Sequence, residues 1–307
     1  MAGPSALWTL PGRWNAVVMN TTKGFKRILL ATDGSEQAEA AVDATIAMVL
    51  PSSAEVRVVH VWNLEVRQRH GHWDIEVRSE AEQLLDTTVK RLTTVGVRAE
   101  GAILRADSGH VAAAVADAAK NFKADLVVVG SRGLSNWQAM LKHSVSHQLL
   151  SAVDCPLLIV RGRAATAGSP QRVLLAIAGG HDIGPAAHAA IAAAASPGSQ
   201  VLVVHVAQLI VGMQGIAYSE PQEEIQATMA RAIKLIEDAG IPAEGVVPHA
   251  GPVADVIAKV AETWEVDLIV IGSSRMGDLA SMVLGSVSHD LLHAAVRPVL
   301  VAERVLK

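Results

Sequence analysis

Short runs of Val, Ile and Leu alternate along most of the chain with longer stretches whose apolar residues recur at helical spacing. Short apolar runs bounded by Gly, Pro or Asp are typical of buried strands, and longer periodic stretches are typical of helices. The pattern predicts strands at 28–31, 56–62, 97–104, 126–129 and 157–160, separated by helices near 35–50, 79–95 and 108–122 and by one from 144. Strands that alternate with helices require right-handed crossovers and a mainly parallel sheet with helices on both faces. The predicted fold class is α/β.

One stretch of the chain occurs twice. The segment DLVVVGSRGLSNWQAMLKHSVSHQLLSAVDCPLLIV begins at Asp125, and DLIVIGSSRMGDLASMVLGSVSHDLLHAAVRPVLVA begins 142 positions later at Asp267. The two segments align without a gap, so that Gly130 matches Gly272 and the tetrapeptide SVSH at 144–147 matches that at 286–289. A repeat of this length indicates two similar Rossmann-like halves, each long enough to bury its own core.

The repeat and the local composition predict the domain limits. Residues 1–22 contain prolines, glycines and no periodicity, which favours a flexible extension. The first domain is expected at 23–162 and the second at 172–307. Between them, residues 163–171 are rich in small residues and Pro, as expected for a linker.

Charge and cysteine content narrow the classes of function. The formal charge is -4, from 30 acidic and 26 basic residues without a long run of either sign, so we expect binding to neither nucleic acid nor membranes. The single cysteine, Cys155, excludes an internal disulfide and fits a reducing compartment. No apolar run approaches the roughly 18 residues of a membrane span. The sequence therefore predicts a soluble cytoplasmic protein.

The candidate site follows from the fold class. In open α/β sheets, ligands bind beyond the carboxyl ends of the strands, where the strand order reverses. The loops predicted there are 32–35 and 130–133, with Ser144 opening the next helix. Glycines allow a close approach of the backbone to phosphate, and amides at a helix start donate to it. The arrangement suits a nucleotide, although no GxxxxGK[ST] and no GxGxxG after a strand occur.

The spacing of these residues resembles that of the universal stress protein family. Its nucleotide-binding members carry G-x2-G-x9-G-[ST] after the fourth strand and an Asp after the first. The first half of this chain has Gly130-x2-Gly133-x9-His143-Ser144 and Asp33. The second half has Gly272-x2-Arg275-x9-Gly285-Ser286, with Ala178 at the position of Asp33. Over about residues 25–304 the chain resembles the tandem form of the family.

This resemblance implies a fold, a ligand and a set of contact residues. The fold is a pair of adenine nucleotide alpha hydrolase-like domains, each with five parallel strands in the order 3-2-1-4-5. The ligand is an adenine nucleotide, ATP with or without Mg²⁺, bound for regulation. The first pocket would use Ala31, Thr32, Asp33, Val61, Val129, Gly130, Arg132, Gly133, His143, Ser144, Val145 and Ser146. The second would use Val206, Ile271, Gly272, Ser274, Gly285, Ser286, Val287 and Ser288.

Other functions stay open at this stage. Both pockets depart from the family pattern, which leaves a nucleotide-independent interaction scaffold as the main alternative. A weak ATPase or a relative of the ATP pyrophosphatases is the third, because 178–182 (AGGHD) follows a first strand as SGGxDS does in those enzymes. No nucleophile, base and acid fall together in a motif, so we assign no catalytic residue and expect a binding protein. A homodimer and an unidentified protein are the open partners.

Histidines are the candidate metal ligands, and the sequence favours a metal-free protein. His70 and His72 lie in a polar segment with no matching third ligand. His60 and His205 lie in apolar strands, where a core histidine with a hydrogen-bond partner is the expected role.

Overall fold

The computed structural model describes residues 24–49, 53–62, 67–69, 72–74, 77–107, 109–131, 144–161, 168–178, 183–212, 215–249, 251–272 and 286–302. These residues separate into two compact domains, one within 24–169 and one within 170–302. The finer limits predicted from the sequence stay a prediction, because much of the expected linker lies outside the described residues.

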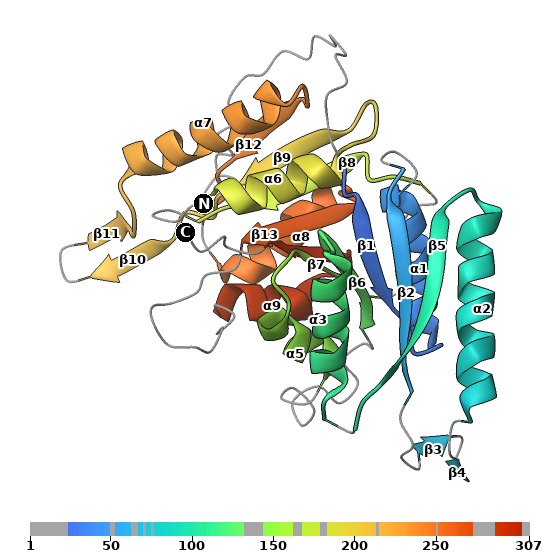
Figure 1. Cartoon of the computed structure of the whole chain (residues 1–307). Coiled ribbons are helices and arrows are strands. Elements are labelled where there is room, and N and C mark those ends of the chain that lie inside the picture. Colours follow the sequence, from blue (N-terminus) through green and yellow to red (C-terminus); the bar gives the residue numbers. More distant parts are fainter. Residues whose placement is uncertain are drawn as a thin grey trace. The chain divides into compact units, whose positions relative to one another are not determined.

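The first domain is a five-stranded parallel sheet with helices on both faces. Its strands lie in the order β5-β2-β1-β6-β7, which is 3-2-1-4-5 in the order in which the chain forms the sheet. Helices α1 and α2 contact one face, and α3 and α5 contact each other and the opposite face. Figure 1 shows β1, β2 and β5 side by side with α2 along β5. The elements are β1 (Arg27–Ala31), α1 (Glu36–Val49), β2 (Glu55–Trp62), α2 (Arg78–Thr94), β5 (Arg98–Arg105), α3 (Val111–Phe122), β6 (Leu126–Ser131), α5 (Val145–Ala152) and β7 (Leu157–Arg161).

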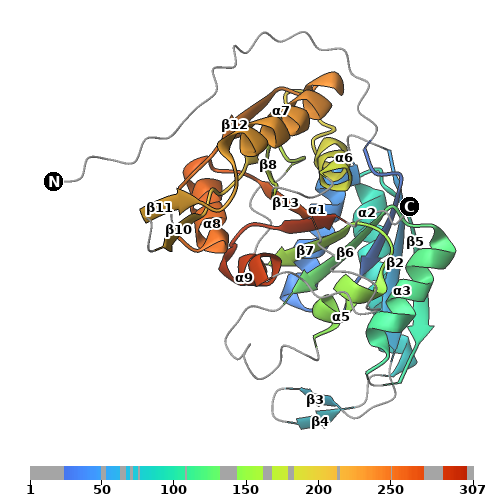
Figure 2. The ribbon, with the colours of Figure 1, turned by 90° about the vertical axis from the view of Figure 1, so that its left-hand side faces the viewer.

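The second domain repeats this arrangement. Its strands lie in the order β12-β9-β8-β13-β14, again 3-2-1-4-5. Helix α6 packs against α7, and α8 packs against α9, as Figure 2 shows from a second side. The predicted fold class is therefore confirmed in both domains. The elements are β8 (Arg172–Ala176), α6 (Gly184–Ala193), β9 (Gln200–Val204), α7 (Gln222–Asp238), β12 (Ala243–Val246), α8 (Val253–Thr263), β13 (Leu268–Gly272), α9 (Ser286–Ala294) and β14 (Val299–Ala302).

Two short hairpins were not predicted. The first joins β3 (Arg67–Arg69) to β4 (His72–Asp74), and the second joins β10 (Leu209–Gly212) to β11 (Gly215–Tyr218). Each follows the second strand of its domain. Strands of three or four residues are too short for an alternating pattern to stand out from the surrounding loop.

The repeated aspartate holds the first and fourth strands together at the amino edge of each sheet. The carboxylate of Asp125 accepts hydrogen bonds from the backbone amides of Lys26 (2.7 Å) and Arg27 (2.9 Å). Asp267 accepts in the same way from Gln171 and Arg172, both at 2.9 Å. Each carboxylate thus satisfies two backbone amides where the first strand of its domain enters the sheet.

We predict that Asp125→Ala lowers the stability of the first domain by about 2 kcal/mol, because two charge-assisted bonds to backbone amides are lost. Asp125→Asn keeps one acceptor oxygen and should lose about half as much. Urea unfolding of the full chain measures both changes. Equal stability of Asp125→Ala and the unmodified chain would contradict this role.

Candidate functional site

The candidate site of the first domain lies where β1 and β6 end side by side. Ala31 pairs with Val129 in the parallel register of these two strands, and the loops that follow leave the sheet at the same edge. Val61 lies at the end of β2, the next strand, and is buried, as is Val129. Ala31, Val61 and Val129 therefore form an apolar surface at the edge of the sheet where the sequence predicts a bound nucleotide.

The loop after β1 is held by its own side chains. The Asp33 carboxylate accepts from the amide of Ser35 through Oδ1 (3.0 Å), and Thr32 Oγ1 accepts from the amide of Gly34 (3.3 Å). Ser35 Oγ in turn accepts from the amide of Ala38 (3.3 Å) and caps the start of α1. Thr32 is buried, whereas Asp33 is exposed. One oxygen of the Asp33 carboxylate is thus held by the amide of Ser35, and the side chain is exposed to solvent.

His60 ties the second strand to this loop. Its Nδ1 lies 2.9 Å from the carbonyl oxygen of Thr32, and the residue is 2% exposed. Because a carbonyl can only accept, Nδ1 carries the proton and donates. The prediction of a core histidine is confirmed at this position, and the bond helps fix the loop that carries Asp33.

Helix α5 begins at the same edge. Ser144 is its N-cap, with Oγ accepting from the amide of His147 at 3.3 Å. Val145 presents its side chain to solvent, whereas Ser146 is buried. The amides of Val145 and Ser146, in the first turn of α5, have no acceptor within the helix and can donate to an anion.

The second domain keeps this plan with one important difference. Ala178, exposed after β8, stands where the first domain has Asp33. Val206 and Ile271 are buried, as are their counterparts Val61 and Val129. In helix α9, Val287 is exposed and Ser288 buried, which matches Val145 and Ser146 in α5.

Several predicted contact residues fall where the structure describes too little to place them. Arg132, Gly133, His143, Ser274 and Gly285 lie outside the described residues, and Ser286 opens α9 without a described side chain. Their predicted contacts stay predictions.

The two matching glycines have different surroundings. A Cβ on Gly130 would lie 2.3 Å from the carbonyl oxygen of Gln37 and 2.7 Å from the amide nitrogen of Ala38. The first turn of α1 therefore packs directly on Gly130, and no side chain fits between them. A Cβ on Gly272 would meet only Ala186 among the residues that the structure describes, at an ordinary 3.8 Å. Gly130 is thus needed for helix packing, independently of any ligand.

A polar cluster in the second domain was missed by the sequence analysis. His205 is 2% exposed, and its Nε2 lies 3.3 Å from Oε2 of Glu220, which stands between β11 and α7. His249, which pairs with Ala207 beside β9, has its ring 5.5 Å from that of Tyr218. Only the unpredicted hairpin brings Glu220 to this place.

Burial lowers the pKa of His205, because the protonated ring loses its hydration there. The carboxylate of Glu220 and the carbonyl of Ile177 oppose this shift but do not cancel it. Folding therefore favours the neutral form of the His205 ring.

Metal ligands and membrane segments were also sought in the part of the chain that the structure describes. It contains no group of three or more His, Cys, Asp or Glu side chains that could hold a metal ion. None of its helices is both long and apolar enough to cross a bilayer.

We predict that Gly130→Ala lowers the stability of the first domain by about 3 kcal/mol, since a Cβ there would push α1 from the sheet. Gly272→Ala is the matched control and should change stability by less than about 0.5 kcal/mol. Chemical denaturation without any nucleotide tests both. Equal effects of the two substitutions would show that Gly130 has no special packing role.

We predict that His205 lowers the free energy of unfolding at acidic pH. Because folding lowers its pKa, His205 binds a proton more tightly in the unfolded chain, where its pKa is about 6.5, than in the folded chain. The stability of the unmodified chain relative to His205→Asn should therefore fall as the pH is lowered from about 7.5 to about 5.5. Urea unfolding at a series of pH values measures the difference. A difference that grows on acidification would mean that attraction to Glu220 outweighs burial.

The similarity to known proteins extends over most of this chain. A universal stress protein of Mycobacterium tuberculosis is 27% identical over 289 residues, which are 90% of this chain and 97% of that protein. A universal stress protein of Archaeoglobus fulgidus has the same fold at a TM-score of 0.70 and 22% identity, covering 91% of this chain and 98% of its own. Some smaller solved universal stress proteins contain adenine nucleotides: one is in complex with cAMP, and one from Arabidopsis thaliana has AMP bound. These two match this chain at TM-scores of only 0.36 and 0.31, covering 45% and 46% of it, so they say nothing about its ligand.

The model of the universal stress protein family matches the chain twice, at residues 24–161 and 170–303. The predicted family and its two-domain form are thus confirmed: the chain belongs to the universal stress protein family.

Proposed function

We propose that this protein binds an adenine nucleotide, with ATP as the expected form, as a regulatory ligand in a stress response. The first domain is the proposed site. The observation that carries this proposal is the position of Asp33: its carboxylate is fixed by a bond to the amide of Ser35, exposed, and set at the edge where β1 and β6 diverge.

The chemistry of this edge suits the parts of a nucleotide. One oxygen of Asp33 holds the loop, which leaves the other to accept from a ribose hydroxyl. The apolar floor of Val61 and Val129 suits a base. The free amides at the start of α5, beginning with Val145, suit phosphate. Whether Mg²⁺ accompanies the phosphates depends on the loop at 132–143, which the structure does not describe.

The second domain is proposed as the weaker site or as a scaffold. The side chain of Ala178 cannot accept a hydrogen bond from ribose. Binding in the first domain would then stabilise the folded state and alter the association of the chain with a second copy or with another protein. The cytoplasm is the proposed compartment.

A thermal titration with ATP, AMP and GTP, each with and without Mg²⁺, tests the proposal. At about 100 times the Kd, a ligand that binds only the folded chain adds about 2.7 kcal/mol of stability. Asp33→Asn keeps an oxygen for the amide of Ser35 but removes the charge, so it should weaken adenine nucleotide binding about tenfold at unchanged intrinsic stability. Ala178→Ser is the matched control in the second domain and should leave the first site unaffected.

Two results would contradict the proposal. The absence of any shift at millimolar nucleotide would favour the nucleotide-independent scaffold. Phosphate release that Asp33→Asn abolishes would favour an ATPase over a regulatory binder.

A further inference from the structure

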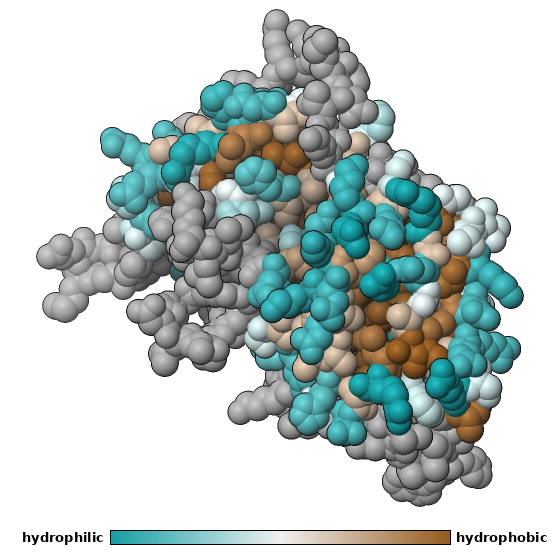
Figure 3. All heavy atoms as spheres, in the orientation of Figure 1, coloured by the Kyte–Doolittle hydropathy of each residue, from teal (hydrophilic) through white to brown (hydrophobic). Residues whose placement is uncertain are grey.

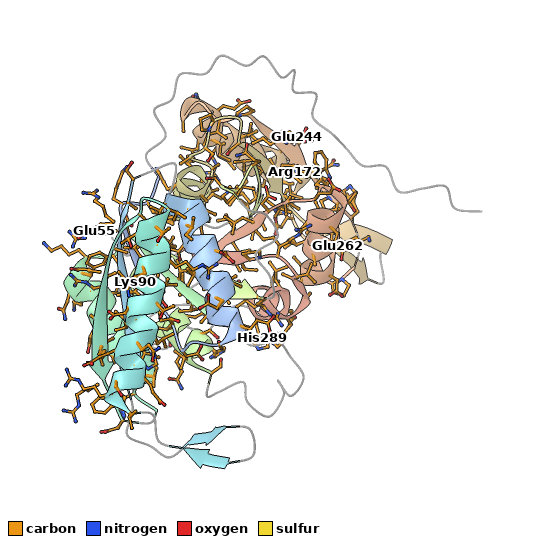
Figure 4. All side chains as sticks on the ribbon, turned by 90° about the vertical axis from the view of Figure 1, so that its right-hand side faces the viewer. Glu55, Lys90, Arg172, Glu244, Glu262 and His289 are labelled. Atoms are coloured by element: carbon orange, nitrogen blue, oxygen red, sulfur yellow. The ribbon has the colours of Figure 1, made fainter. Side chains whose placement is uncertain are left out.

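The second domain contains a hollow at the edge of its sheet opposite the candidate nucleotide site. It is a shallow depression where strands β8, β9 and β12 begin, and it is open to solvent. We name it the amino-edge hollow. Figure 4 labels two of its residues, Arg172 and Glu244. Its lining residues are Arg172, Val173, Gln200, Val201, Leu202, Glu244, Trp264 and Val266.

In the first domain, an arginine occupies the equivalent place. Arg57 on β2 pairs in register with Glu100 on β5, and their side chains form an ion pair. The guanidinium carbon of Arg57 also lies 4.4 Å from the centre of the Phe122 ring. The guanidinium is therefore held between a carboxylate and an aromatic face, an arrangement that favours arginine in particular.

Arg27, whose guanidinium carbon also lies 4.4 Å from the centre of the Phe122 ring, has Arg172 as its counterpart in the second domain. The second domain thus keeps the carboxylate, the aromatic ring and this arginine, but it has Leu202 in place of Arg57. The register of β9 and β12 places Leu202 opposite Glu244, as that of β2 and β5 places Arg57 opposite Glu100. Trp264 precedes β13 by the same number of residues as Phe122 precedes β6, and each is followed by a residue with positive φ.

The hollow is lined by a carboxylate that has no cationic partner among the described residues. Glu244 forms no hydrogen bond or ion pair with any residue that the structure describes, and burial raises its pKa. Arg172 is paired with Glu265 at 3.0 Å, where the first domain has Lys123. Among these residues the second domain thus has one cation and two carboxylates.

We propose that the amino-edge hollow binds the guanidinium group of an arginine side chain presented by a partner polypeptide. The guanidinium would stack on Trp264 and pair with Glu244, as Arg57 does with Phe122 and Glu100 within the first domain. Charge complementarity and this filled counterpart identify the occupant. An ammonium group lacks the flat face and the paired donors, so lysine fits less well.

N-acetyl-arginine amide is the probe that tests the proposal, with the ¹⁵N-labelled full chain as the target. The signal of the Trp264 indole N–H, assigned by its loss in Trp264→Phe, should shift and saturate in the millimolar range expected for one such pair. The capped lysine should bind more weakly, and capped citrulline, which is uncharged, should produce no shift.

Three variants locate the site. Glu244→Gln keeps the shape of the side chain and should weaken binding roughly tenfold. Leu202→Arg supplies the missing guanidinium internally and should abolish the shift. Arg57→Leu should create a second binding site in the first domain, at Phe122 and Glu100.

Two results would overturn the proposal. One is the absence of a Trp264 shift at the highest soluble concentration of the capped arginine. The other is a shift that Glu244→Gln leaves unchanged. The Glu244→Gln measurement tests the proposal even if the Leu202→Arg variant does not fold.

Discussion

The fold depends on the parallel pairing of the first and fourth strands in each domain. The strands reached through long connections, β6 and β13, enter the sheet beside β1 and β8 and so reverse the strand order there. At the amino edge, Asp125 and Asp267 bind the backbone amides that begin β1 and β8. At the carboxyl edge, the chain must leave the sheet in opposite directions. The same pairing therefore creates both the stability of each domain and the place for a ligand.

The two domains share this plan but have diverged at both edges. At the carboxyl edge, the first domain retains Asp33 and the second has Ala178. At the amino edge of the first domain, Arg57 pairs with Glu100. In the second domain, the corresponding Glu244 has no cationic partner among the described residues. The first domain thus has both the carboxylate of Asp33 and the arginine, and the second domain has neither. A duplicated chain can diverge in this way because each copy retains its own core while its surface changes.

The fold class could be predicted from the sequence, because apolar runs and their gap-free repeat indicate strands that alternate with helices in two similar halves. The strand order followed from the resemblance to the family. The role of individual residues could not be predicted. Gly130 resembles a phosphate-loop glycine, yet the backbone of α1 packs directly on it, and only three-dimensional packing reveals this contact. The partners of His205 and Arg57 lie 15 and 43 positions away, respectively, in elements whose register no local pattern specifies. The predicted contacts of Gly133, His143 and Gly285 stay predictions.

The central claim is that the edge marked by Asp33 holds an adenine nucleotide. The most direct measurement is the identity and molar ratio of any small molecule released when the purified full chain is denatured. Our account predicts an adenine nucleotide at about one per chain, because one domain has the carboxylate and the other does not. Release of no nucleotide, together with no binding of ATP when it is added back at millimolar concentration, would contradict it.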